Sequence, residues 1–176
     1  VSVAMLTATG VDGAALAQAT EGLDLLEIPY SSGSDANSAL VGGHCDLYVC
    51  GWDDISGLIE SGDIVPILAL SETRMSIAPD LQCSVENGIN SVMGPWRGIF
   101  AKKGTPQEAI DTLVAAIEQA KQSDTWKEFT HNAAYDERPI PEPGEATVEF
   151  CQKEYKDLRD YMVEQGTLVK DYDDLK

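Results

Sequence analysis

Short apolar runs alternate with short helical patterns over the first 70 residues of the chain. Four apolar runs predict strands, at residues 3–6, 24–29, 46–50 and 64–70. The segments between them predict helices, at about 12–20, from Ser34 or Asp35 to Val41, and at 53–60. This order, with its short connections, predicts an α/β fold in which helices cover both faces of a parallel-rich sheet.

The pattern changes in the second half of the chain. Residues 71–90 are rich in Ser, Pro, Asp, Asn and Gly and lack periodicity, and residues 92–101 are expected to be extended. Helices are predicted after Thr105, at 126–132 and at 145–165. We therefore divide the chain into an α/β ligand-binding lobe, residues 1–90, and a crossover strand with a C-terminal helical segment, residues 91–176.

The helix after Thr105 carries clear local signals. Thr105 is predicted to be its N-cap, with Pro106 at the first position and Glu108 completing a capping box. Apolar residues then recur at helical spacing at Ile110, Leu113, Val114 and Ile117. This helix is therefore expected to bury one face.

The charge of the chain restricts its partners. Twelve basic residues stand against 30 acidic ones, so the net charge is −18. Such a surface repels phosphate backbones, which excludes nucleic acid as a partner, and an anionic ligand would need local donors such as helix N-termini. No apolar run approaches the roughly 18 residues of a membrane span, so direct membrane insertion is not expected. The first residues also lack the basic start and cleavage site of a secretory signal.

Catalytic motifs are missing from the sequence. The two histidines, His44 and His131, have no metal-ligand spacing, and His44 is adjacent to Cys45, so the two side chains would point to opposite faces of a strand. Nucleotide-binding and nucleophile motifs are also missing, so no catalytic residue, metal or cofactor is expected. An α/β enzyme that uses Asp46 with His44 is the least favoured function.

Two glycine-bearing turns are the better candidates for a site. Thr9 and Gly10 follow the first predicted strand, and Ser31, Ser32, Gly33 and Ser34 follow the second. Each turn opens a helix, whose first N–H groups and partial positive charge could hold a carboxylate without an arginine. The alternative is that both turns are ordinary connections of an α/β fold.

The four cysteines, Cys45, Cys50, Cys83 and Cys151, are too sparse for a disulfide framework. One structural disulfide is compatible with the sequence, but buried free thiols are the favoured state.

Several motifs, in order along the chain, resemble one family. These are residues 28–36 (IPYSSGSDA) with 39–46 (ALVGGHCD), 59–69 (IESGDIVPILA), 74–80 (RMSIAPD), 86–88 (ENG) and 96–106 (WRGIFAKKGTP). Together they resemble the receptors of tripartite tricarboxylate transporters, the TctC or Bug family. Lys102 stands where that family usually has proline, and the N-terminal part of the family's first lobe has no counterpart here.

The resemblance implies a periplasmic solute-binding protein of two α/β lobes, not an enzyme. Its ligand would be a small organic acid, such as a di- or tricarboxylate, delivered to the membrane subunits of a transporter. Residues 91–176 would then be the remnant of the other lobe. A sensor or protein-interaction module derived from such a receptor is the alternative function.

The resemblance also assigns site residues. Thr9 and Gly10 match one ligand-facing turn of the family, and Tyr30 with the four residues that follow it matches a second. Asp46 matches the aspartate of the family's "gGhvD" motif, where it would either contact the ligand or pin the hinge backbone. Pinning the backbone is favoured, because a carboxylate repels a carboxylate ligand.

Overall fold

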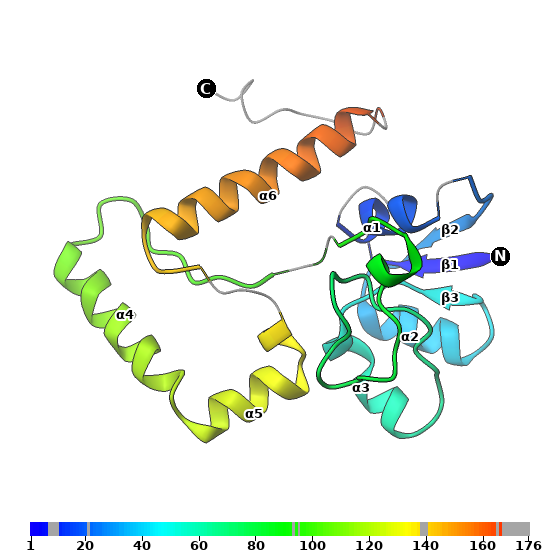
Figure 1. Ribbon diagram of the computed structural model, residues 1–176, viewed down its shortest axis with the longest axis horizontal. Helices are drawn as coiled ribbons and strands as arrows, with labels where there is room; N and C mark the ends of the chain where they lie inside the picture. The colour runs from blue at the N-terminus through cyan, green and yellow to red at the C-terminus, as the bar shows by residue number, and fades with distance from the viewer. Residues whose placement is uncertain are drawn as a thin grey trace.

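A three-stranded parallel sheet lies at the centre of the first half of the chain (Figure 1). The computed structural model describes residues 1–6, 11–20, 22–92, 94, 96–137, 141–164 and 166. The strands are β1 (Ser2–Met5), β2 (Leu26–Pro29) and β3 (Leu47–Tyr48), in the order β2-β1-β3. Because all three run parallel, their carboxyl ends share one edge of the sheet.

Helices cover both faces of this sheet, as the sequence predicts. They are α1 (Val11–Ala19), α2 (Gly33–Val41) and α3 (Trp52–Glu60). Neighbouring residues of β1 point to opposite faces, so Ala4 packs with Ala36 of α2, whereas Val3 and Met5 pack with Leu16 of α1. The two small clusters on either side of β1 form the core.

The fourth predicted strand does not form. Residues 64–70 are extended, but only a single bridge joins Ala69 to Cys83, and Val65 and Ile67 are exposed. Alternating apolar residues make a strand only where a neighbouring strand pairs with them, and among the described residues none pairs with this segment. Residues 71–91 are irregular apart from the short 3-10 helix η1 (Val85–Asn87).

The second half of the chain is helical. It contains α4 (Gln107–Ala120), α5 (Asp124–Asn132), the 3-10 helix η2 (Tyr135–Glu137) and α6 (Glu145–Glu164). In Figure 1, α4 and α5 lie to one side of the sheet, and α6 begins on the side away from the sheet and runs toward α1, with which it makes contacts. None of the helices in the described ranges is long and apolar enough to cross a membrane.

Two predictions about α4 are wrong. Thr105 does not cap the helix: its hydroxyl donates to the carbonyl of Lys102 at 2.8 Å, and Pro106 occupies the N-cap without a side-chain hydrogen bond. None of the four apolar residues of its predicted face is fully buried either: Leu113 is 54% exposed, and Ile110, Val114 and Ile117 are partly buried. The shorter helix α5 is capped as expected for a serine, since Ser123 Oγ accepts from the backbone N–H of Trp126 at 3.2 Å.

All four cysteines are free thiols. Cys45 and Cys83 are buried, and Cys50 and Cys151 are partly buried. The structure therefore agrees with the favoured of the two cysteine states.

Candidate functional site

The turn between β2 and α2 lies at the carboxyl edge of the sheet. The N–H of Tyr30 donates to the carbonyl of Met5 at 2.9 Å, which places the turn beside the end of β1. Ser32 is the N-cap of α2, where its hydroxyl accepts from the N–H of Asp35 at 3.2 Å and lies 2.9 Å from the hydroxyl of Ser34. The sequence expected Ser34 or Asp35 in the capping position. The first N–H groups of α2 have no acceptor within the helix, so they form an anion-attracting end.

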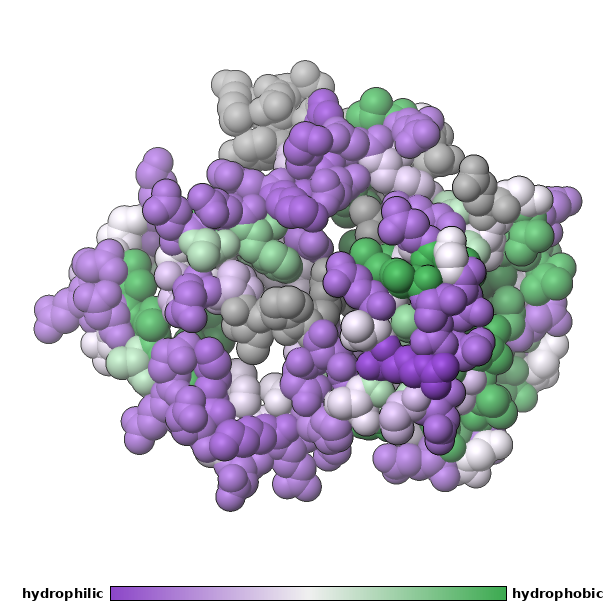
Figure 2. Space-filling model, in the orientation of Figure 1, coloured by the Kyte–Doolittle hydropathy of each residue, from purple (hydrophilic) through white to green (hydrophobic). Residues whose placement is uncertain are grey.

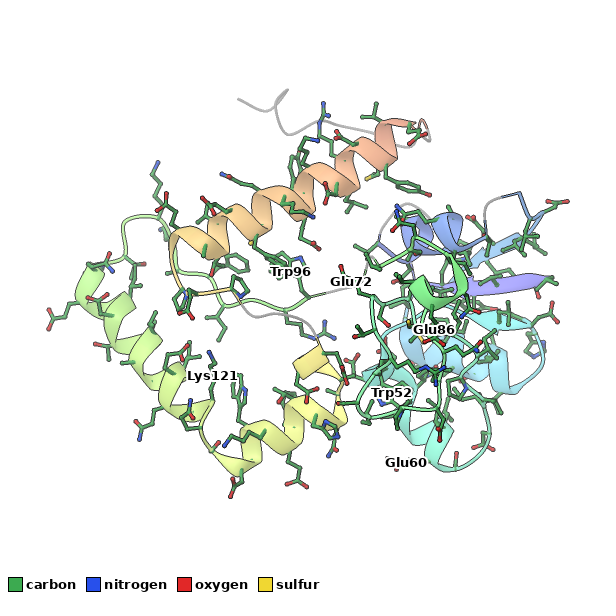
Figure 3. All side chains as sticks on the ribbon, viewed as in Figure 1. Trp52, Glu60, Glu72, Glu86, Trp96 and Lys121 are labelled. Atoms are coloured by element: carbon green, nitrogen blue, oxygen red, sulfur yellow. The ribbon has the colours of Figure 1, made fainter. Side chains whose placement is uncertain are left out.

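Side chains from β3 and α3 face the start of α2. A Cβ atom at Gly33 would lie 3.5 Å from Asp54 Oδ1 and 3.6 Å from the hydroxyl of Tyr48. Three fully buried polar atoms in these elements have no hydrogen-bond partner among the described residues: Tyr48 OH, Trp52 Nε1 and Asn37 Oδ1 (Trp52 is labelled in Figure 3). Unpaired buried donors and acceptors are costly, and they are available to a ligand.

This edge of the sheet is acidic. Partial burial raises the pKa of Asp12, and the nearby carboxylate of Asp54 raises it further. The pKa of Asp54 is also raised, first by partial desolvation and then by the neighbouring Asp53. Burial and these carboxylates raise the pKa of the Cys50 thiol and of the Tyr48 hydroxyl, so both groups stay protonated and can donate hydrogen bonds.

Asp53 joins the sheet to the C-terminal half of the chain. Its Oδ2 accepts from the hydroxyl of Tyr135 at 2.6 Å and from Arg97 Nη2 at 3.0 Å. The guanidinium of Arg97 also lies over the ring of Tyr135, 5.3 Å from its centre. A second link runs from the N–H of Ser76 to the carboxylate of Glu137 at 2.6 Å. These contacts hold η2 against the start of α3 and the irregular segment after residue 69.

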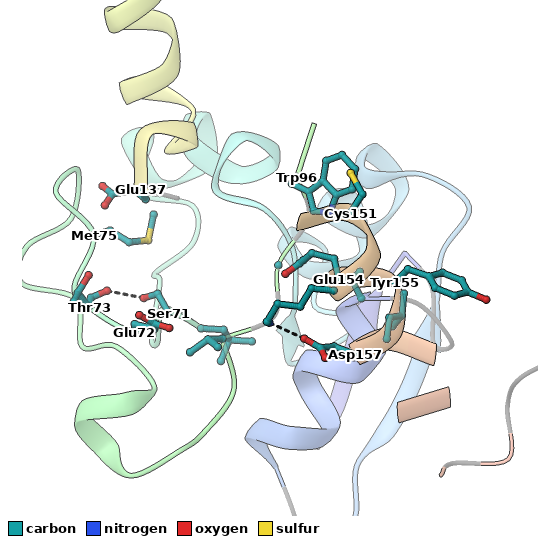
Figure 4. A pocket seen from close by; sticks show the side chains of 16 residues that line it. Ser71, Glu72, Thr73, Met75, Trp96, Glu137, Cys151, Glu154, Tyr155 and Asp157 are labelled. Atoms are coloured by element: carbon teal, nitrogen blue, oxygen red, sulfur yellow. Dashed lines mark hydrogen bonds and ion pairs between the residues drawn. The ribbon is translucent and has the colours of Figure 1, made fainter. Parts of the chain in front are cut away.

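A cavity of about 590 Å³ opens between the irregular segment after residue 69 and α6 (Figure 4). Figure 4 shows Ser71, Glu72, Thr73 and Met75 on one side of it and residues of α6 on the other. The remaining lining comes from Val11, Leu70, Val92, Gly94, Trp96, Glu137, Cys151, Lys153, Glu154, Tyr155, Asp157 and Leu158. Its volume is that of a small-molecule site.

The cavity and the turn before α2 belong to one continuous edge. Val11 lines the cavity, and the next residue, Asp12, is close enough to Asp54 for their charges to interact. Asp54 in turn lies against Gly33 at the start of α2. These neighbouring residues connect the cavity to the start of α2, although no residue of the turn lines the cavity.

Buried serines fix the wall of the cavity. The hydroxyl of Ser84 donates to the carbonyl of Ser91 at 2.6 Å and accepts from the N–H of Ser71 at 3.1 Å. The hydroxyl of Ser91 donates to the carbonyl of Ala15 at 2.9 Å, which ties the same segment to α1. On the surface, Arg74 pairs through two nitrogens with the carboxylate of Glu86, at 2.8 and 2.7 Å. Residues 71–75 are thus positioned from both sides.

The structure brings together only part of the predicted site. Tyr30, Ser31, Ser32, Gly33 and Ser34 form the turn at the carboxyl edge, although none of them lines the cavity. Thr9 and Gly10 lie outside the described residues. Sequence reasoning missed the cavity wall, which comes from segments far apart in the chain. It also missed Asp53 and Asp54, which the sequence could have indicated because they lie in the first turn of the helix that follows β3.

Asp46 lies at the opposite edge of the sheet. Its Oδ2 accepts from the N–H of Ser2 at 2.7 Å and from the hydroxyl of Ser2 at 2.9 Å. Asp46 precedes β3, and in a parallel sheet a residue before a strand lies at the amino edge. The geometry matches the favoured of the two predicted roles, pinning the backbone, here that of β1, and it places Asp46 away from the carboxyl edge where the other predicted contacts lie.

Replacing Asp46 with alanine is expected to lower the melting temperature at neutral pH and to leave ligand affinity unchanged. The N–H and hydroxyl of Ser2 hold the pKa of Asp46 below its usual value. A lowered pKa in the folded state gives stability above the unfolded pKa, and this stability is lost as the pH falls through the folded pKa. Melting curves at neutral pH and at about pH 3 should thus show the difference between wild type and D46A narrowing in acid. A difference that is constant with pH would contradict the assigned role.

Among the described residues, no group of three or more His, Cys, Asp or Glu side chains is arranged to hold a metal ion. The molecule thus offers an α/β sheet with a turn and unpaired polar groups at its carboxyl edge, and a cavity of small-molecule size lined by other residues. In open α/β sheets this edge is where ligands bind. An α/β fold with a cavity of this size is compatible with the binding of a small molecule.

Comparison with known proteins gives the family. Residues 2–165 match the tripartite tricarboxylate transporter family receptor, TctC, and the chain belongs to this family. It is a family of binding proteins, not of enzymes.

Curated relatives are similar over part of their length. The chain is 30% identical over 112 residues to a UPF0065 protein of Bordetella pertussis, and the match covers 63% of this chain and 35% of that protein. It is 25% identical over 136 residues to a UPF0065 protein from the gbd 5′ region of Cupriavidus necator, and that match covers 77% of this chain and 41% of that protein. The chain thus spans about a third to two fifths of the curated relatives it matches.

Solved structures confirm the fold class. The periplasmic binding protein BugD has a TM-score of 0.72 at 24% identity, and the match covers 95% of this chain and 57% of that one. MatC of Rhodopseudomonas palustris, solved with bound malate, has a TM-score of 0.70 at 22% identity, and the match covers 92% of this chain and 56% of that one. The α/β arrangement with a parallel sheet is that of periplasmic binding proteins.

Proposed function

We propose that the chain forms the ligand-contacting part of a periplasmic receptor that binds a small organic acid, of the di- or tricarboxylate class. The receptor delivers this acid to the membrane subunits of a tripartite tricarboxylate-type transporter. The observation that carries the proposal is the cavity of about 590 Å³ at the carboxyl edge of the sheet. A relative of the same fold holds malate, which supports a carboxylate as the ligand.

The ligand is proposed to reach from the cavity to the start of α2. Its carboxylate would accept hydrogen bonds from the N–H groups and hydroxyls of residues 31–34, and the buried hydroxyl of Tyr48 is a further donor beside them. Thr9 and Gly10 remain predicted contacts from the neighbouring turn. No arginine is needed in this arrangement, because helix N-termini and neutral donors hold the anion.

Asp54 competes with the ligand for this position. Its carboxylate lies against Gly33, where a bound carboxylate would meet the start of α2. Ligand binding is therefore favoured when Asp54 is protonated. Because partial desolvation and Asp53 raise the pKa of Asp54, protonation sets in at a higher pH than for an ordinary aspartate.

Binding of L-malate to the wild-type chain is expected to weaken as the pH rises through the raised pKa of Asp54. The variant D54N should bind more tightly at neutral pH and lose most of this dependence. It should also melt at a higher temperature at neutral pH, since a raised folded pKa costs stability above that pKa. The affinity of both proteins for malate is measured by calorimetric titration at each pH. The ionisation of malate itself affects both affinities equally, so it cancels when they are compared. If the affinities of wild type and D54N change with pH in parallel, Asp54 does not lie in the ligand site.

Two bulky substitutions test the position of the ligand. Ser34 and Thr73 are both exposed, so S34W and T73W should fold, while each fills one end of the proposed site. Both are expected to weaken binding of a small-acid probe (malate, succinate or citrate) by about tenfold or more. The exposed Ser61, at the C-cap of α3, gives the matched control S61W.

The outcomes of this titration are distinct. If the wild-type chain binds none of the acids, the proposed function fails. If S34W binds as well as wild type while T73W does not, the turn before α2 leaves the site and the cavity remains. If both variants bind normally, the ligand lies elsewhere.

A further inference from the structure

One carboxylate of the chain itself is bound at the cavity wall in the way a ligand would be. Glu137 of η2 lines the cavity, and its Oε1 accepts from the N–H of Ser76 at 2.6 Å and from the hydroxyl of Ser76 at 2.7 Å. Figure 4 shows Glu137 on the same side of the cavity as Met75, the residue before Ser76. Two short hydrogen bonds to one charged oxygen are an arrangement that recognises a carboxylate.

The two donors of Ser76 are positioned by contacts that do not involve Glu137. Arg74 Nη1 donates to the carbonyl of Pro79 at 3.2 Å, which closes the loop around Ser76. Within this loop the N–H of Ala78 donates to the carbonyl of Met75 at 3.1 Å. The loop therefore keeps its shape when the side chain of Glu137 moves away, and the donors of Ser76 become available to another carboxylate.

The backbone of η2 is likewise held without Glu137. Two residues earlier, the hydroxyl of Tyr135 donates to Asp53 Oδ2 at 2.6 Å, and the guanidinium of Arg97 lies 5.3 Å from the centre of the Tyr135 ring. These contacts anchor η2 to the first turn of α3. The side chain of Glu137 can therefore leave Ser76 by a local movement, while η2 stays in place.

The surroundings of the cavity are polar and acidic. Figure 2 shows hydrophilic residues over α5 and much of α6 on the face in view, and the net charge of the chain is −18. Besides Glu137, the cavity is lined by Glu72, Glu154, Asp157 and Lys153, of which Lys153 pairs with Asp157 at 2.8 Å. An anion that entered beside Glu137 would be repelled by it, whereas an anion that takes its place gains two donors and meets one carboxylate fewer.

We propose that Ser76 is a carboxylate-binding site of the cavity and that Glu137 is its built-in competitor, which a carboxylate of the incoming ligand displaces. The inference rests on the proposed function in taking that ligand to be an organic acid. Without ligand, Glu137 closes the site. The apparent affinity for the acid is then reduced to the fraction of molecules in which Ser76 is free of Glu137. Binding of the acid releases the side chain of Glu137 from Ser76.

Sodium acetate tests the Ser76 site without any assumption about the ligand. In the variant E137A, acetate should shift the backbone amide resonance of Ser76 in a saturable way, relative to the same concentration of sodium chloride. Wild type should show no such shift, and E137Q, which keeps the size of the side chain but not its charge, should respond between the two. The matched control is D136A, which removes a carboxylate that contacts His131 at 3.1 Å and leaves Glu137 on Ser76. D136A should behave as wild type.

Calorimetric titration with L-malate tests the competition. E137A should bind malate about tenfold more tightly than D136A, as expected if Ser76 is free of Glu137 in about a tenth of wild-type molecules. Both variants remove one negative charge, so the difference between them measures the loss of the competitor.

The proposal is overturned if acetate leaves the Ser76 resonance of both E137A and E137Q unmoved, or if D136A responds to acetate as E137A does. It is also overturned if E137A and D136A bind malate with equal affinity. If acetate shifts Ser76 in E137A but no protein binds malate, succinate or citrate, the carboxylate site on Ser76 stands and the proposed function fails.

Discussion

Replacing Met5 with alanine is expected to lower the free energy of unfolding by about 2–5 kcal/mol, the cost of emptying a large buried position. Met5 is fully buried at the end of the central strand, against Leu16 of α1. Few large side chains are buried as completely: the largest are Met5, Val3 and Cys83, and much of the remaining core is alanine. A core this thin leaves little stability in reserve, so M5A should populate the unfolded state at ambient temperature.

Urea denaturation of M5A and of the matched variant M5L measures this effect. Leucine conserves the buried volume, so M5L should lose less than about 1.5 kcal/mol. A loss below about 1 kcal/mol in M5A would show that β1 is not the centre of the core.

Replacing Ser84 with alanine is expected to cost about 1–3 kcal/mol and to weaken ligand binding. Ser84 is fully buried, and its hydroxyl donates to the carbonyl of Ser91 and accepts from the N–H of Ser71. Alanine would leave both backbone groups without this partner. Because Ser71 lines the cavity, the wall should loosen and the affinity should fall.

The control for Ser84 is Ser61, whose hydroxyl contacts Leu58 and Asp63 on the exposed surface. S61A should change neither stability nor affinity by more than a small amount. If S84A lost stability but kept full affinity, the serine network would support the fold without shaping the cavity. If S84A were as stable as S61A, the hydrogen bonds of Ser84 would contribute nothing to the free energy of unfolding.

The sequence predicted the elements that depend on local pattern. β1, β2 and the three helices of the first half form close to their expected bounds, because alternation and helical spacing act over a few residues. The prediction of a strand at 64–70 was wrong for a different reason. A strand also needs a neighbouring strand to pair with, and the apolar alternation of Val65 and Ile67 does not show whether such a strand is present. The face of α4 was predicted to be buried for the same reason, since periodicity identifies an apolar face but not the element that covers it.

In the candidate site, too, the local sequence pattern predicts some parts, whereas other parts depend on packing between distant segments. The turn of residues 30–34 was predicted because it directly follows a strand, and the parallel order places it at the carboxyl edge of the sheet. That rule, applied to the third strand, would have favoured Asp53 and Asp54, in the first turn of the helix after it, over Asp46, at the first position of the predicted strand. The cavity could not be predicted, because Thr73, Trp96 and Tyr155 come together only through the packing of α6 against the irregular segment.

Native mass spectrometry of the purified 176-residue chain, with any released small molecule identified, tests whether the cavity is an organic-acid site. We expect a one-to-one complex with a small organic acid that exchanges for added malate and is lost in T73W. A chain that stays bare in the presence of excess malate, succinate and citrate, or a complex that T73W retains, would contradict the assignment of this cavity as the site of an organic-acid receptor.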